Sequence, residues 1–354
     1  MQRKRVLAFP HGWKNHCFRL SKMKFEWEKL GLILDPKKHL GNGWSHAQVP
    51  FTRKIEGELR IYFSTRKQID GEGQYVSVPR YVDFRFEDFP QKFTVGETPI
   101  IQVGNDGDFD RFGAMAGSVV RIGDHLSLFY TGWNRSVSVP YDWNIGVAEG
   151  NLAGSAFSRV LPGPIIGPSP GEPYLFACPV VFNFGGALRM LYLGGEKWFK
   201  STTGKMESQY LLRTATSVDG LHWDRSGSPL LSAVVADESQ TSATVIQIEQ
   251  TYYMFFSYRY GVGFREEPGK GYRIGVAVSH DFETWDRQDQ LAGIDVSSEG
   301  WDSEMVAYPH LFSLNGDVYM LYCGNSFGSG GFGLARLRTS LAGKKWRIIT
   351  SDGD

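Results

Sequence analysis

The segments that decide the fold are YFST at 62–65, FYTG at 129–132, LYLG at 191–194, FFSY at 255–258 and LYCG at 321–324. Each reads as a short aromatic strand that ends in or near a small residue, and successive copies start 67, 62, 64 and 66 residues apart. Self-similarity at a fixed period is the signature of a repeat architecture in which each copy is one supersecondary unit. The sequence therefore predicts five copies of one unit.

Each tetrapeptide lies between two further predicted strands. The preceding strands are expected at 46–52, 115–122, 177–183, 242–248 and 307–313. The following strands are expected at 81–86, 145–150, 211–217, 274–279 and 332–337. Gly-Asp and Gly-Gly turns typical of β-hairpins join several of these strands to the tetrapeptides, as in IGDHL and FGGAL. Fourth strands are clearest at 222–227 and 284–288.

Five units of four strands predict an all-β fold, a five-bladed β-propeller with four-stranded antiparallel blades. A sandwich does not predict five near-equal periods, and a solenoid would repeat faster. We expect residues 23–354 to form this single domain and residues 1–22, which match no repeat, to be a flexible or upstream extension. Residues 25–31 resemble 221–227 and are predicted to supply the outer strand of the last blade, with 344–350 as the competing segment.

Composition narrows the class of protein. Lys and Arg total 38 and Asp and Glu total 38, so no global field favours nucleic acid or an anionic membrane as a partner. No stretch approaches the length of a membrane span or of a signal-peptide core. Cys17, Cys178 and Cys323 are odd in number and far apart, which favours reduced thiols and a cytoplasmic protein. The histidines show no metal-ligand spacing, and no cofactor or metal is predicted.

The N-terminal ends of the first strands should meet at one mouth of the ring, and they carry acids from four of the five units. The candidate catalytic residues are Asp110, Glu172, Asp302 and Glu304, and Glu238 lies at the corresponding place in the fourth unit. Glycoside cleavage uses one carboxylic acid to protonate the leaving oxygen and a second carboxylate as base or nucleophile. The alternative is that an acid before a strand is a solvated turn residue.

A second set of polar and aromatic residues follows the tetrapeptides or starts a first strand near the same mouth. The predicted substrate-binding residues are His46, Arg66, Trp133, Asn134, Glu238, Tyr258, Arg259, Tyr308 and Asn325. Aromatic rings beside Arg and Asn suit a sugar, and Arg66 and Arg259 could pair with a carboxylate or phosphate of an anionic carbohydrate. The alternatives are that these arginines bridge blades through the acids and that His46 is a structural hydrogen-bonding residue.

These residues also carry a resemblance to a known group. RIYFSTR at 60–66, YRIGVAVS at 272–279 and GWDSEMVAYPHLF at 300–312 resemble bacterial glycosidase-like five-bladed propeller proteins, often associated with cell-surface polysaccharide genes. More remotely, the architecture is similar to arabinanases, xylosidases and invertases, and to mannoside phosphorylases.

The remote resemblance implies an Asp base on blade 1, an Asp on blade 2 and a Glu acid on blade 3. Asp110 and Glu172 stand at the matching places on blades 2 and 3, but blade 1 has Ser45, His46 and Ala47 with no Asp in register. The leading hypothesis is a glycoside hydrolase with Glu172 as acid and Asp302, Glu304 or Asp110 as base. The alternatives are a phosphorylase or glycosyltransferase and a non-catalytic sugar-binding propeller.

Overall fold

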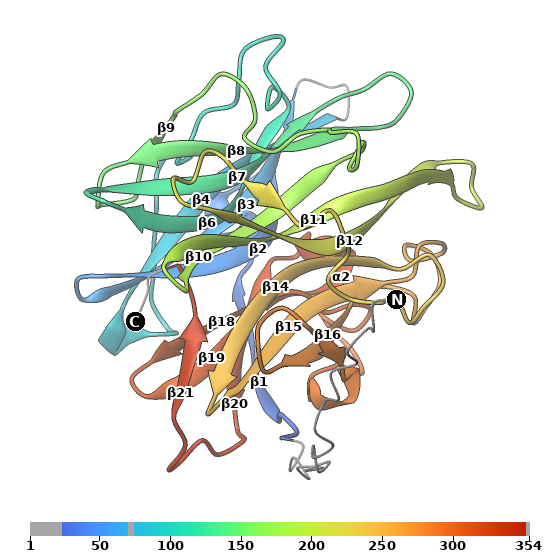
Figure 1. Ribbon diagram of the computed structural model, residues 1–354. Helices are drawn as coiled ribbons and strands as arrows, with labels where there is room; N and C mark the ends of the chain where they lie inside the picture. Colours follow the sequence, from blue (N-terminus) through green and yellow to red (C-terminus); the bar gives the residue numbers. More distant parts are fainter. Residues whose placement is uncertain (1–22, 70–73, 352–354) are drawn as a thin grey trace, which may run out of the picture.

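The computed structural model describes residues 23–69 and 74–351 (Figure 1). Nearly all of its regular structure is β-strand in antiparallel sheets, which confirms the all-β fold class. The predicted extension at 1–22 lies outside the described residues.

The strands form five successive antiparallel units, each a meander with a short or displaced fourth strand. The first strands are β2 (Trp44–Ile55), β6 (Gly113–Ile122), β10 (Phe176–Phe184), β14 (Ser239–Ile248) and β18 (Ala307–Leu314). The second strands, which contain the five tetrapeptides or their first three residues, are β3 (Glu58–Ile69), β7 (His125–Asn134), β11 (Ala187–Lys200), β15 (Thr251–Arg259) and β19 (Asp317–Cys323). The third strands are β4 (Gln74–Arg85), β8 (Asp142–Gly150), β12 (Met206–Ser217), β16 (Arg273–Ser279) and β20 (Phe332–Leu337).

The fourth strands come from two parts of the chain. Four of them follow their own units, namely β5 (Thr94–Val95), β9 (Phe157–Arg159), β13 (Asp224–Arg225) and β17 (Asp286–Arg287). The fifth unit is completed by β1 (Trp27–Leu34), which pairs antiparallel with β20, and Figure 1 shows the blue β1 beside β20. The prediction that residues 25–31 supply this strand is therefore confirmed. The competing segment forms β21 (Trp346–Ile349), which pairs with the inner strand β14 instead.

Short helical segments connect some of the strands. They are α1 (Pro36–Leu40), η1 (Phe86–Asp88), η2 (Asp289–Leu291) and α2 (Asn325–Gly328). Asp35 caps α1 by accepting a hydrogen bond from the backbone N–H of Lys37. Among the described residues, no helix has the length and apolar character that a membrane crossing requires.

The apolar core lies between neighbouring units. Five large clusters of buried side chains each combine strands of two successive units, and one of them packs the fifth unit against the first. In that cluster the rings of Phe63 on β3 and Phe332 on β20 are 5.8 Å apart. The first strands also contact one another in cyclic order, from β2 through β6, β10, β14 and β18 back to β2. Second strands read as continuous apolar runs because both of their faces are covered.

Each first strand is bulged near its N-terminal end. The pairing register of every first strand with its second strand shifts there, and in four units a non-glycine residue adopts a left-handed conformation. These residues are Val49 (φ 50°), Cys178 (φ 52°), Ser242 (φ 47°) and Tyr308 (φ 56°). A bulge bends a strand and re-aims its side chains. Val49, Cys178 and Tyr308 thereby become part of one cavity.

Candidate functional site

A cavity of about 150 Å³ lies where the five units meet. First strands contribute residues near their bulges, second strands contribute residues near their ends, and third strands contribute residues near their starts. The aromatic part of the wall consists of Trp133, Tyr141, Trp143, Tyr210, Phe264, Tyr272, Tyr308 and Phe327. Largely apolar pockets with a few convergent polar groups are typical of small-molecule sites.

The charged side chains that line this cavity, within the described part of the chain, are all arginines. The Arg66 guanidinium lies 5.2 Å from the Trp133 ring centroid, and that of Arg259 lies 3.5 Å from the Phe264 ring centroid. Arg265 lies over Phe264 and Phe327, and its Nε is 3.1 Å from a carboxylate oxygen of Glu207. Burial lowers the pKa of Arg66, and the positive charge of Arg265 lowers it further. The cavity is therefore cationic.

Two tyrosine hydroxyls form a hydrogen-bonded pair in the wall. Oη of Tyr210 and Oη of Tyr272 are 2.5 Å apart, and Arg259 donates to Tyr210 Oη at 3.2 Å. Burial raises the pKa of Tyr272 and of Tyr308 well above the usual value, so both hydroxyls stay protonated at neutral pH.

Four of the predicted substrate-binding residues meet in this cavity. They are Arg66, Trp133, Arg259 and Tyr308, which come from four different units. Their side chains are far apart in sequence, and only the packing of the units brings them together.

His46 lies close to this group, beside the cavity wall. Its Nδ1 is 2.9 Å from the Ser45 hydroxyl, and its ring centroid is 6.4 Å from that of Tyr75. Burial, with the nearby charge of Arg66, lowers the pKa of His46 to about 3. The imidazole is therefore neutral at physiological pH.

The predicted catalytic acids Asp110, Glu172 and Asp302 are buried and engaged within their own units. Each accepts a hydrogen bond from a tyrosine of the second strand and pairs with a basic residue of the fourth strand. These partners are Tyr130 and Arg159 for Asp110, Tyr192 and Arg225 for Glu172, and Tyr322 and Lys29 for Asp302. None of the three acids is among the described residues that line the cavity. The structure thus does not bring them together, and the arrangement fastens the segment before each first strand to the outer strand of the same unit.

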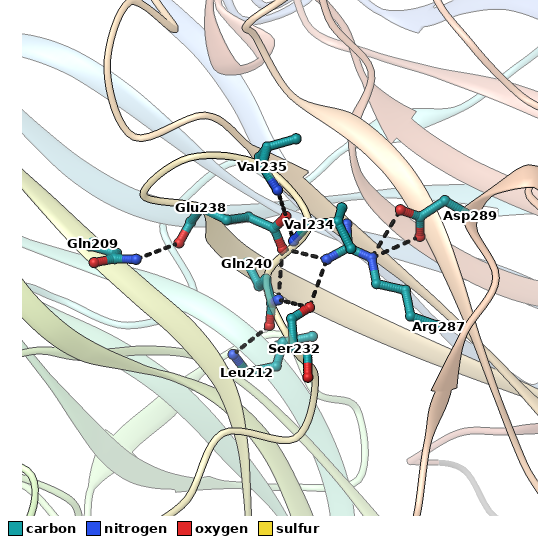
Figure 2. Close-up of polar contacts among 9 residues, drawn as sticks. All are labelled: Gln209, Leu212, Ser232, Val234, Val235, Glu238, Gln240, Arg287 and Asp289. Carbon is teal, nitrogen blue, oxygen red and sulfur yellow. Dashed lines mark hydrogen bonds and ion pairs between the residues drawn. The ribbon is translucent and has the colours of Figure 1, made fainter.

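Glu238 has the same kind of environment in the fourth unit, where Phe256 stands in place of the tyrosine. Figure 2 shows Glu238 with Arg287, Gln240, Val234 and Val235 around its carboxylate. Its carboxylate accepts from Arg287 at 2.5 Å, from the Gln240 amide at 2.7 Å and from the backbone N–H groups of Val234 and Val235. These donors satisfy the buried carboxylate, so its predicted contact with a substrate has no support in this geometry.

Glu304 differs from the other acids because its side chain is exposed. It lines a second cavity of about 180 Å³, which shares Phe264 and Arg265 with the first. Within residues 23–69 and 74–351 its carboxylate forms no ion pair. Of the four predicted catalytic acids, Glu304 is therefore the one with an exposed carboxylate, unpaired among the described residues, in a cavity that adjoins the main cavity.

The remaining predicted residues stabilise loops or line another depression. Asn325 Oδ1 accepts from the backbone N–H groups of Glu304 and Met305, and Asn134 Nδ2 donates to the carbonyl of Asp108. Tyr258 lies in an open depression beside Asp289, under the guanidinium of Arg287.

Several cavity residues were missed by the sequence prediction. Tyr210 lies within β12 and Tyr272 lies directly before β16. Phe264 and Arg265 lie in the loop between β15 and β16, and Phe327 lies in α2. The prediction considered the starts of first strands and the ends of second strands. Aligning the third strands would have revealed the tyrosines, whereas the loop residues follow no repeat.

The described residues include no group of three or more His, Cys, Asp or Glu side chains placed to hold a metal ion. Cys178 and Cys323 are buried free thiols, and Cys17 lies outside the described residues.

Comparison with known proteins establishes the family. "Uncharacterized protein Rv1502" of Mycobacterium tuberculosis (strain ATCC 25618 / H37Rv) is 37% identical over 317 residues, which span 88% of this chain and 99% of the relative. This chain belongs to the family of that protein. "Uncharacterized protein MT1551" of strain CDC 1551 / Oshkosh gives the same values. No family model matches the chain.

Solved structures share the fold of this family. A glycosyl hydrolase from Bacteroides ovatus has a TM-score of 0.66 at 15% identity and covers 93% of this chain and 97% of its own. A GH130 structure, from a family described as mannoside phosphorylases that contains glycoside hydrolases, has a TM-score of 0.64 at 15% identity, covering 94% and 96%. Another glycoside hydrolase has a TM-score of 0.69 at 16% identity, covering 89% and 92%. These similarities confirm the remote glycosidase-like resemblance at the level of fold.

Proposed function

We propose that the five units are the blades of a five-bladed β-propeller. The cyclic contacts of the first strands and the apolar cluster between the fifth and first units support a closed ring. In this arrangement the first strands line the central channel, and the cavity is one mouth of that channel.

The propeller is, in this proposal, a carbohydrate-active protein that binds a sugar in the mouth cavity. One observation carries the proposal: side chains from all five units form a single small cavity with aromatic walls and arginine donors. Aromatic faces pack against the apolar face of a sugar ring, while arginine and tyrosine donors bind its oxygens. The glycosidase fold of the structural neighbours is consistent with this ligand.

For catalysis, the proposed chemistry is glycoside hydrolysis with Glu304 as the acid or base. Glu304 has an available carboxylate, and Arg265 lies between its cavity and the main cavity. Glu266 and Glu267 line the same second cavity and are the candidates for the second carboxylate. Asp110, Glu172 and Asp302 are weaker candidates because their charges are already balanced by Arg or Lys.

A non-catalytic sugar-binding propeller is the second candidate function. It is favoured by the absence of any carboxylate among the described residues that line the main cavity. Phosphorolysis or glycosyl transfer would instead require a phosphate or a nucleotide sugar as co-substrate.

A panel of glycans tests the proposal by binding and by product release, with and without inorganic phosphate. We expect binding of at least one glycan and release of its terminal residue without phosphate. Glu304→Gln should bind that glycan and lower kcat by at least about 100-fold, whereas the exposed control Glu299→Gln should not. Binding without turnover would favour the non-catalytic function, phosphate-dependent release would favour a phosphorylase, and no binding across the panel would contradict a carbohydrate ligand.

A further inference from the structure

We propose that the mouth cavity recognises an anionic group on a terminal sugar residue, such as the carboxylate of a sugar acid or a phosphate ester. This inference rests on the proposed carbohydrate function and specifies the substrate class. It follows from the charge of the cavity wall, from the number of hydrogen-bond donors relative to acceptors in it, and from the cavity volume.

Two of the three arginine charges in the cavity wall have no carboxylate partner among the described residues. Glu207 pairs with Arg265, but within the described residues neither Arg66 nor Arg259 has a carboxylate partner. The Nε atoms of Arg66 and Arg259 are buried and have no hydrogen-bond partner among those residues. Arg259 donates to the backbone carbonyls of Tyr260 and Ser208, but these acceptors are neutral, and a buried cation without a counter-charge is costly. An anionic ligand would relieve this cost at the moment of binding.

The hydroxyl groups of the wall add donors rather than acceptors. An arginine can only donate, so Tyr210 Oη accepts from Arg259, and one of the two hydroxyl protons lies between Tyr210 and Tyr272. The second proton of the tyrosine pair has no acceptor among the described residues, so it is available to a ligand. Among the described residues, the fully buried side-chain oxygens of the wall that have no hydrogen-bond partner are Oε1 of Gln48 and Oγ1 of Thr241. Arginine and tyrosine donors thus outnumber acceptors, which suits a carboxylate or phosphate.

The size and the apolar walls indicate that the anion is attached to a ring. An apolar cavity of about 150 Å³ holds a benzene molecule in other proteins, so the volume suits one six-membered ring. Free phosphate would leave the Trp133, Trp143 and Phe264 faces without a matching apolar surface. A cavity that admits one ring favours the terminal residue of a chain over an internal one.

The test compares acidic sugars with their neutral parents on the intact protein. Glucuronate, galacturonate and glucose 6-phosphate are titrated by calorimetry beside glucose, galactose and inorganic phosphate, and a glycan array extends the comparison to acidic and neutral termini. We expect at least one acidic member to bind about 10- to 100-fold more tightly than its neutral parent, and its affinity to fall with rising salt. Thermal stabilisation of the unmodified protein by the same compounds provides a readout that needs no variant.

Arg66→Met removes one unpaired cation and should abolish this preference, while binding of neutral sugars persists. Arg66→Lys should restore part of it, because the charge returns without the planar fork. Arg135→Met is the matched control: Arg135 is exposed, packs 4.0 Å from the Phe112 ring centroid and lies outside the cavity wall.

The possible outcomes separate this inference from the proposed function. Equal binding of acidic and neutral sugars would overturn the inference and leave the carbohydrate function standing. Binding of inorganic phosphate as tight as that of glucose 6-phosphate would also overturn it, because the anion would then not need the sugar. If no sugar bound on the array, both the inference and the proposed function would fall.

Discussion

At the scale of single residues, the same solution for a buried carboxylate recurs around the molecule. Asp110, Glu172, Glu238 and Asp302 are each at most 3% exposed, and each pairs with an Arg or Lys of its own unit's fourth strand. A buried charge without such a partner is very costly. From the sequence, Asp110, Glu172 and Asp302 are predicted to be catalytic and Glu238 to bind substrate. The structure gives all four acids a structural explanation.

Glu172→Gln should lower the stability of the protein. The substitution keeps the shape of the side chain but removes the charge that Arg225 Nη1 contacts at 3.0 Å and Arg213 Nε at 3.4 Å. Breaking a buried pair typically costs about 3–5 kcal/mol, so we expect a loss of about 3 kcal/mol in the free energy of unfolding, measured with urea.

Glu304→Gln is the matched comparison, since it removes an exposed carboxylate with no ion pair among the described residues. Its unfolding should change by less than about 0.5 kcal/mol. If Glu172→Gln retained full stability and lost turnover instead, Glu172 would return as the general acid.

At the scale of elements, the contact of β18 with β2 joins the fifth unit to the first and depends on a neutral histidine. The backbone N–H of Thr52 on β2 donates to Nε2 of His310 on β18 at 3.0 Å. Burial lowers the pKa of His310 to about 3, well below its value in an unfolded chain. A protonated His310 could not accept this hydrogen bond.

Acid should therefore loosen the molecule through His310. Between pH about 6.5 and about 3 the unfolded chain binds a proton at His310 that the folded chain does not, so the free energy of unfolding falls as the pH falls. Linkage gives about 2 kcal/mol for this group between pH 7 and pH 5. Urea unfolding across this range should show the slope.

His310→Gln should flatten that slope, because glutamine does not titrate and its amide oxygen can accept from Thr52. His46, whose pKa is also about 3, should leave a residual slope. The exposed control His280→Gln should keep the full slope, and an unchanged slope in His310→Gln would rule out this role.

At the scale of the whole molecule, each unit buries its apolar faces against two neighbours. Phe63 of the first unit packs against Phe332 of the fifth, although the two residues lie near opposite ends of the chain. β1, near the start of the described chain, likewise pairs with β20 near its end and completes the fifth unit. Because neighbouring units share their apolar clusters, a unit that loses its packing also exposes apolar side chains of its neighbours.

Phe63→Ala should weaken the molecule as a unit. The side chain is fully buried, and truncating a buried phenylalanine costs about 3–5 kcal/mol. Because the lost contacts join the first and fifth units, unfolding followed by far-UV circular dichroism and by tryptophan fluorescence should shift together to lower temperature. Two separated transitions would show that the units unfold independently and would argue against a closed ring.

The sequence by itself determined the repeat and most of the strands. The spacing of the aromatic tetrapeptides located the second strands, and the flanking patterns located the first and third strands, because alternation and turn chemistry are local properties of the chain. The likeness of 25–31 to 221–227 also predicted that the N-terminal segment completes the last unit. The same alignment brought Arg66, Trp133, Arg259 and Tyr308 to one mouth, where the cavity contains them.

Only the tertiary structure decided which polar residues face that cavity and which are bonded inside a unit. The sequence places both Asp110 and Arg66 near the predicted mouth. In the structure Arg159 pairs with Asp110, whereas Arg66 forms no ion pair with a carboxylate among the described residues. Tyr210, Tyr272 and Arg265 joined the site through third strands and a loop that the pattern did not single out. The physical reason is that a side chain's partner comes from another unit or another strand, and its position depends on bulges and packing rather than on local sequence.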